Sequence, residues 1–186
     1  MEKDPWSVVI DRIHQQGKSF WGSMRINDGH GSDYAPRSRF GVDHPEFFVG
    51  ERCAAKLHPP GPDGEVPPCR HLNYALPEVR AHRKELIAEL CRRYDIDGFE
   101  WDFTRDNGHS FTKADVFRAG DIMTEYMREI RELLDQIGQE RGRPFGFGAR
   151  VPGTLEVCRQ SGLEVDTWIK EGIITSLTPS VYYDTS

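Results

Sequence analysis

Residues 95–104, with the sequence DIDGFEWDFT, contain the pattern that decides the fold. From Gly98 onward, small or acidic side chains alternate with aromatic ones, and a repeat of two is typical of a β-strand. The aromatic side chains of the predicted strand, at about 96–103, therefore face one side, and Glu100 and Asp102 face the other. We expect the aromatic side to pack in a core and the two carboxylates to face a pocket.

Helical patterns flank this strand on both sides. Residues 77–93 begin with Pro77 and Glu78, which suit the first turn of a helix, and continue with apolar side chains at helical spacing. Residues 114–140 predict a longer helix, which Gly120 is expected to weaken or kink. The predicted apolar stripe of this helix comprises Val116, Phe117, Ile122, Met123, Tyr126, Met127, Ile130, Leu133, Leu134 and Ile137.

The alternation of helix and strand continues toward both ends of the chain. Further helices are predicted over 4–16, 154–161 and 165–171, and further strands over 18–27, 145–151 and 173–180. The first helix has a predicted apolar stripe of Trp6, Val9, Ile10 and Ile13. Such an order implies parallel strands joined by right-handed crossovers. We therefore predict an α/β protein with a partial (β/α)8, TIM-barrel-like fold, in which about four parallel strands alternate with helices.

The length of the chain limits how much of a barrel it can form. A complete TIM barrel typically has about 250 residues, whereas this chain has 186. We predict a single domain over 1–186 that forms part of a barrel, with a second copy or the missing barrel half as its partner. Residues 28–72 are rich in Gly and Pro and are predicted to form a long loop, which at this length is usually functional or flexible.

Composition narrows the classes of function. The net charge of −6 disfavours binding to nucleic acid or to an anionic membrane, because both need a basic surface. Residues 1–20 are mixed and polar and contain neither a signal peptide nor a membrane span, which leaves localisation undetermined and an exported origin open. Cys91 and Cys158 are predicted to be small buried side chains, whereas Cys53 and Cys69 flank a loop and would be able to pair in an oxidising compartment.

Polar side chains are concentrated where the predicted strands end. In a parallel barrel the C-terminal ends of all strands lie on one face, so these side chains are expected to converge. Carboxylate and amide groups hydrogen-bond sugar hydroxyls, and aromatic rings stack on the apolar face of a sugar. An oligo- or polysaccharide substrate is therefore predicted. The candidate catalytic residues are Glu100 and Asp102, and the candidate substrate-binding residues are Arg25, Asn27, Asp28, Arg105, Arg150 and Tyr182.

Two carboxylates suit the hydrolysis of a glycosidic bond, which needs a proton donor and a nucleophile or base. Glu100 and Asp102 are two strand positions apart, or about 6.6 Å, a spacing that does not separate retaining from inverting chemistry. Asp102 is predicted to be the nucleophile, base or transition-state stabiliser, and Glu100 the second carboxylate or a modulator of Asp102. The alternative is an ion-pair network with Arg25 and Arg150 that only supports the core.

A metal site is a further alternative at the same strand ends. Asn27, Asp28 and His30 are suitable ligand types for a metal, but the grouping is too generic to prefer. A metal-assisted hydrolase that uses Asp28, His30 and Asp102 is the third hypothesis. The sequence contains no Gly-rich phosphate loop, no G-x-S-x-G elbow and no H-E-x-x-H motif. We therefore predict no cofactor and no metal.

Two short motifs within residues 72–105 resemble those of a known group of proteins. Residues 77–80, with the sequence PEVR, and residues 94–98, with the sequence YDIDG, are similar to a helix start and a strand of barrels related to glycosyl-hydrolase-like family 10. The resemblance implies a (β/α)8 barrel and action on glycosidic bonds. It also implies that Asp102 corresponds to the acid at the end of the family's strand.

The same strand resembles the D-x-x-D-x-D-x-E strand of family-18 chitinases. Asp97, Glu100 and Asp102 match its first three acidic positions, but Thr104 stands where that family has its catalytic glutamate. A threonine cannot serve as the proton donor. Either the acid comes from another strand, or the site only binds sugar. Two hypotheses follow: a glycoside hydrolase, or a catalytically silent carbohydrate-binding barrel.

Overall fold

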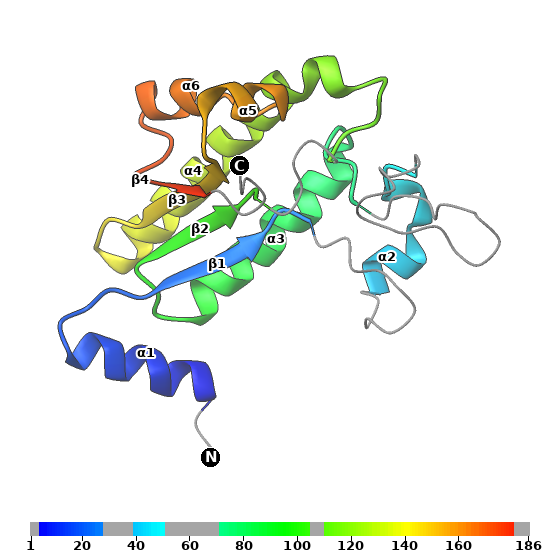
Figure 1. Cartoon of the computed structure of the whole chain (residues 1–186). Coiled ribbons are helices and arrows are strands. Elements are labelled where there is room, and N and C mark those ends of the chain that lie inside the picture. The colour runs from blue at the N-terminus through cyan, green and yellow to red at the C-terminus, as the bar shows by residue number, and fades with distance from the viewer. Residues whose placement is uncertain (1–3, 28–38, 51–70, 105–109, 181–186) are drawn as a thin grey trace, which may run out of the picture.

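The computed structural model describes residues 4–27, 39–50, 71–104 and 110–180. Its centre is a four-stranded parallel sheet in which the strands lie side by side in chain order (Figure 1). The strands are β1 (Trp21–Arg25), β2 (Gly98–Asp102), β3 (Gly146–Pro152) and β4 (Ser176–Ser180). Sequential parallel neighbours are the arrangement of a TIM barrel. The predicted fold class, a partial barrel of four parallel strands alternating with helices, is therefore confirmed.

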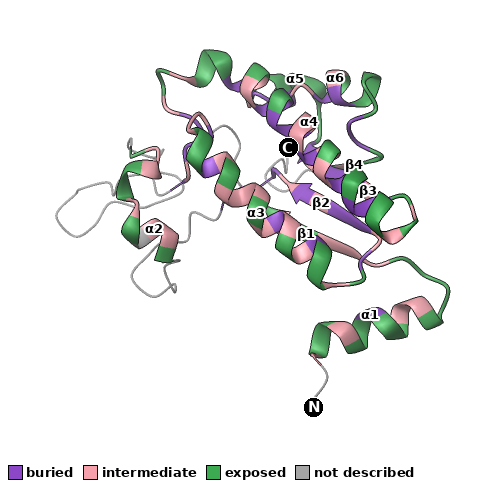
Figure 2. Cartoon of the chain, turned by 180° about the vertical axis from the view of Figure 1, so that it is seen from behind, coloured by how far each residue is buried: buried purple, intermediate pink, exposed green. Residues whose placement is uncertain are grey.

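Helices connect the strands and cover one face of the sheet. They are α1 (Pro5–Gln15), α2 (Arg39–Asp43), η1 (Pro45–Phe47), α3 (Pro77–Arg93), η2 (Val116–Arg118), α4 (Ala119–Arg141), α5 (Leu155–Gln160) and α6 (Val165–Lys170). Helices α3 and α4 lie behind the strands in Figure 1 and in front of them in Figure 2, which views the molecule from the opposite side. The other face of the sheet, which would be the interior of a closed barrel, carries none of the described helices.

The core lies between the sheet and helices α3 and α4. Phe99 and Trp101 of β2 and Phe147 of β3 have no exposed surface and point toward these helices. The helices contribute their own fully buried side chains, among them Ile87, Cys91, Tyr126, Met127, Ile130 and Leu134. Burying this apolar surface orients β2, so that its acidic residues turn to the opposite face.

Two predicted helical stripes extend further than the structure allows. Helix α4 begins at Ala119 instead of near 114, because residues 112–115 form a turn in which the Thr112 hydroxyl donates to Asp115 at 2.7 Å. As a result Phe117 lies in η2 and is 79% exposed. In α1, Trp6 is 58% exposed and Ile10 is the buried apolar side chain.

The N-terminal half of the uncovered sheet face is filled by one aromatic ring. A side chain at Gly98 would meet the Trp21 ring at 2.6 Å, and one at Gly146 would overlap the same ring. The glycines that alternate in β2 and β3 thus make room for an indole that lies across three strands. The part of the β3 face that carries Gly146 is therefore occupied by the indole.

Several predictions fall partly outside the described residues. Cys91 and Cys158 are buried and unpaired, as predicted, and burial raises the pKa of Cys91 to about 12. Cys53 and Cys69 lie outside the described segments. In the predicted loop at 28–72, the described residues form α2, η1 and a bridge between Phe48 and Leu72. The extent of the predicted single domain, 1–186, stays a prediction. Over the four described segments, no helix has the length and apolar character needed to cross a membrane.

Candidate functional site

Two rows of residues, all polar except one glycine, lie on the uncovered face of the sheet, closer than Trp21 to the C-terminal ends of the strands. Strand register brings one residue of each strand into each row, and paired residues of parallel strands point to the same face. The lower row is Ser23, Glu100, Gly148 and Ser176, and the upper row is Arg25, Asp102, Arg150 and Thr178. The structure therefore brings four sequence-predicted residues, Arg25, Glu100, Asp102 and Arg150, to one face at the C-terminal half of the strands.

Glu100 is the hub of this face. Its Oε1 accepts hydrogen bonds from the Ser23 hydroxyl at 3.3 Å and from Arg150 Nε at 3.2 Å. Its Oε2 accepts one from the Thr178 hydroxyl at 3.1 Å. The side chain is only 17% exposed. Glu100 thus links all four strands, and both of its oxygens are already hydrogen-bonded within the protein.

Asp102 is bonded through one oxygen only. Its Oδ1 accepts from the backbone N–H of Thr104 at 2.9 Å and from the Thr104 hydroxyl at 2.6 Å. Within the described part of the chain, Oδ2 has no hydrogen-bond partner. This oxygen lies at the end of β2 and is available to a ligand.

Thr104 has a role that the sequence analysis missed. It is buried and donates twice to Asp102, which holds the carboxylate in one orientation. The signal was present in the Asp-x-Thr spacing, since an aspartate often accepts from the backbone N–H two residues ahead. Thr104 therefore positions the acid beside it instead of supplying a second one.

Arg150 is anchored through one edge of its guanidinium. Its Nε donates to Glu100, whereas Nη1 and Nη2 have no partner among the residues that the structure describes. The side chain is 39% exposed. Arg150 therefore offers free N–H groups in the same row as the free oxygen of Asp102. Arg25 is exposed and is the register neighbour of Asp102 on the other side.

Asn27 uses its amide to hold two loops against the end of β1. Its Nδ2 donates to the Leu72 carbonyl at 3.3 Å and to the Ser110 hydroxyl at 3.1 Å, while its Oδ1 accepts from the Leu72 N–H at 2.9 Å. The residue is 5% exposed. The structure thus gives Asn27 a positioning role for the loops that lead into α3 and α4, and its contact with substrate stays a prediction.

The remaining predicted site residues cannot be placed. Asp28, His30, Arg105 and Tyr182 lie outside the described residues. The metal site of Asp28, His30 and Asp102 therefore stays a prediction, because two of its three residues lie outside the described segments. In the segments that are described, no group of three His, Cys, Asp or Glu side chains is arranged to hold a metal ion.

A second charged cluster lies at the opposite, N-terminal end of the strands. Asp97 Oδ2 accepts from the Phe20 N–H at 2.7 Å and lies 2.8 Å from His14 Nε2, and Oδ1 is bonded by Arg143. Burial alone would raise the pKa of Asp97, but the bonds from Phe20, His14 and Arg143 together lower it. Asp97 thus fixes α1 to the sheet and has no free oxygen.

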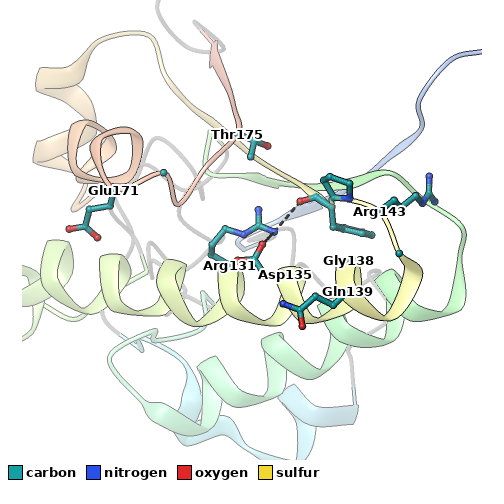
Figure 3. A pocket seen from close by; sticks show the side chains of 11 residues that line it. Arg131, Asp135, Gly138, Gln139, Arg143, Glu171 and Thr175 are labelled. Atoms are coloured by element: carbon teal, nitrogen blue, oxygen red, sulfur yellow. Dashed lines mark hydrogen bonds and ion pairs between the residues drawn. The ribbon is translucent and has the colours of Figure 1, made fainter.

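A groove is present on the helix side of the sheet, away from Glu100 and Asp102. It encloses about 730 Å³ between the C-terminal half of α4 and the segment before β4 (Figure 3). Arg131 in this groove donates to the Phe145 carbonyl at 3.0 Å and pairs with Asp135 at 2.8 Å. Arg143 and Glu171 also line it and pair with Asp97 and Arg128. These charges are already paired, so the uncovered sheet face is the better candidate site.

Solved structures with a similar fold include glycoside hydrolases. An α-amylase from Malbranchea cinnamomea matches with a TM-score of 0.50 and 15% identity over 92% of this chain and 32% of that one. An α-galactosidase from Lactobacillus brevis matches with a TM-score of 0.46 and 16% identity over 96% and 21% of the two chains. The maltogenic α-amylase AmyB from Thermotoga neapolitana matches with a TM-score of 0.45 and 15% identity over 78% and 27%.

The chain therefore spans about a third or less of the length of the structures that it matches. No protein-family model matches the sequence. A search of curated proteins found no similar sequence. At this identity the likeness to the α-amylase shows the fold alone, which is part of a TIM barrel.

Proposed function

We propose that this chain contributes the site of a glycoside hydrolase-like barrel, and that Asp102 acts on a carbohydrate. The observation that carries the proposal is the free oxygen of Asp102, which lies in the same row as the free N–H groups of Arg150. An oriented carboxylate at the C-terminal end of a barrel strand is where TIM-barrel enzymes place reacting groups. The resemblance to barrels related to glycosyl-hydrolase-like family 10 supports the same assignment.

Each residue has a distinct part in the proposed chemistry. Asp102 is the nucleophile, base or stabiliser of positive charge at the sugar carbon, because its free oxygen can approach the substrate. Glu100 holds the guanidinium of Arg150, which binds substrate. Glycoside hydrolysis needs a second acid to protonate the leaving oxygen. Since Glu100 is hydrogen-bonded at both oxygens, we assign that acid to another part of the complete barrel.

A non-catalytic carbohydrate-binding barrel is the second candidate. Hydrolysis needs two carboxyl groups, but Asp102 is the one carboxylate with a free oxygen on the described part of β2. This observation favours binding without cleavage. Thr104, at the position of the chitinase glutamate, donates to Asp102 and cannot protonate a leaving group. Such a site would bind sugars through Asp102 and Arg150 without cleaving them.

The two candidates differ in turnover. Purified protein and its Asp102→Asn variant are incubated with a panel of oligosaccharides, and both binding and new reducing ends are measured. Turnover that is lost in the folded variant supports the hydrolase. Binding without turnover in either protein supports the binding barrel. Absence of any sugar binding would rule out both.

A further inference from the structure

We infer that the sugar recognised at this face carries a carboxylate, as a uronic acid does, and that Arg150 binds it. The inference rests on the proposed carbohydrate function and specifies the substrate class of the same site. It starts from the observation that Arg150 is held at one edge and free at the other.

The guanidinium is fixed before any ligand arrives. The hydroxyls of Ser23 and Thr178 donate to Glu100, and Glu100 in turn accepts from Arg150 Nε. A carboxylate that is only 17% exposed thus sets the direction of the arginine. Because little side-chain freedom remains to be lost, an anion that meets Arg150 binds at a reduced entropic cost.

The free edge of Arg150 has the shape of a carboxylate receptor. With Nε occupied by Glu100, the terminal Nη1 and Nη2 remain as donors. Two parallel N–H groups of a planar guanidinium match the two oxygens of a planar carboxylate, which is a charge-assisted bidentate contact. A neutral hydroxymethyl group presents a single oxygen and would use one of these donors.

The neighbours of Arg150 indicate how such a sugar would lie. Asp102 flanks it on β2 and Thr178 flanks it on β4. Repulsion directs the ligand carboxylate away from Asp102, toward the β4 side. The sugar ring then extends toward β2, where the free oxygen of Asp102 accepts from ring hydroxyls or approaches the reacting carbon. Arg25 and Arg150 equal Glu100 and Asp102 in number of charges, so this face has no net negative charge that would oppose the ligand carboxylate.

Pairs of methyl glycosides that differ only at the sixth carbon test the inference. Methyl glucuronide, galacturonide and mannuronide are compared with the matching neutral glycosides by calorimetric or NMR titration. We expect the uronate of at least one pair to bind about ten-fold or more tightly than its neutral partner. Raising NaCl from about 50 mM to about 500 mM should weaken uronate binding and leave neutral binding nearly unchanged.

Variants identify the residue responsible. Arg150→Lys keeps the positive charge but loses the two parallel N–H groups of the guanidinium, and should reduce the preference for uronates to about three-fold or less. Arg150→Met should remove this preference. Arg92→Gln, which removes an exposed arginine on α3, is the matched control and should retain the full preference. Circular dichroism and thermal melting establish that each variant is folded.

Each outcome has a defined meaning. Equal binding of uronates and neutral sugars by the wild-type protein overturns the inference and leaves the carbohydrate function standing. A uronate preference that survives in folded Arg150→Met also overturns it, because another cation would then be responsible. Binding of no sugar in the panel overturns the carbohydrate function, and the inference with it.

Discussion

Asp97, which directly precedes β2, and Asp102, which ends it, lie five positions apart, yet the protein uses them differently. Asp97 receives bonds at both oxygens, from Phe20, His14 and Arg143. Asp102 receives both of its bonds at one oxygen, from Thr104. Both residues match acidic positions of a chitinase-like motif. The comparison teaches that an acidic residue is functional through its unused hydrogen-bonding capacity, which a motif does not reveal.

The largest expected effect is on turnover, which Asp102→Asn should reduce strongly and Asp97→Asn should leave nearly unchanged. Asp102→Asn should lower turnover of a cleaved substrate by about 10² to 10⁴-fold, the range for loss of a catalytic acid or base. Asp97→Asn should leave turnover of the remaining folded protein within about three-fold, because it lies at the far end of the strand. Steady-state kinetics with both variants check this. A comparable loss in both would mean that Asp102 acts through the fold.

For stability, we expect Asp97→Asn to have a larger effect than Asp102→Asn. Asp97→Asn should lower the free energy of unfolding by about 2 kcal/mol, since hydrogen bonds to a charged group are weakened. Asp102→Asn should change it by about 0.5 kcal/mol or less. Urea denaturation measures both values. If Asp102→Asn proved the more destabilising substitution, the free oxygen would have a structural partner outside the described residues.

The pH dependence of stability offers an independent check on Asp97. Because the pKa of Asp97 is lowered in the folded protein, its contribution is present above the unfolded pKa of about 3.9 and is lost as pH falls through the folded pKa. Wild-type protein should therefore lose more stability on acidification over this range than Asp97→Asn. Equal acid sensitivity of the two proteins would contradict this assignment.

The contact between the Trp21 ring and Gly146 predicts a smaller effect on stability, which depends on whether the ring is present. Gly146→Ala places a methyl group against the indole, and overpacking of this kind costs about 1–3 kcal/mol. The same substitution in a Trp21→Ala background should cost about 0.5 kcal/mol or less, because the clash is gone. A double-mutant cycle in urea gives the coupling energy. Additive effects would show that the ring can move aside freely.

The smallest expected effect is on sugar affinity and comes from losing the hydrogen bond between the Thr104 hydroxyl and Asp102. Thr104→Val removes one hydroxyl bond and should weaken sugar binding about five-fold, or about 1 kcal/mol. Thr104→Ser retains the hydroxyl and should bind within about two-fold of wild type. Titration with the best-bound glycoside compares them. Equal binding by the Val and Ser variants would mean that the backbone N–H alone orients Asp102.

The fold was predictable because its signals are local. Pro77 and the apolar spacing after it gave helix α3 with its observed ends, and the alternation in β2 gave the correct face for Glu100 and Asp102. The start of α4 was wrong, since the turn between Thr112 and Asp115 displaces the first helical residues.

The site was predictable only in part, because its details depend on contacts between distant residues. That four strand ends share one face follows from parallel topology. That both oxygens of Glu100 are hydrogen-bonded depends on Ser23 and Thr178, which are 77 and 78 residues away in the chain. Likewise, the ring of Trp21 reaches Gly98 and Gly146 only when the strands are paired.

The bonds at Glu100 also bear on the kinetics of folding. They join residues separated by 77, 50 and 78 positions, so three long loops must close before all of them exist. Contacts of this range are expected to form late, after the local helices. Substitutions that remove them should therefore accelerate unfolding more than they slow refolding. The group that orients the site would thus also limit how long the folded sheet persists.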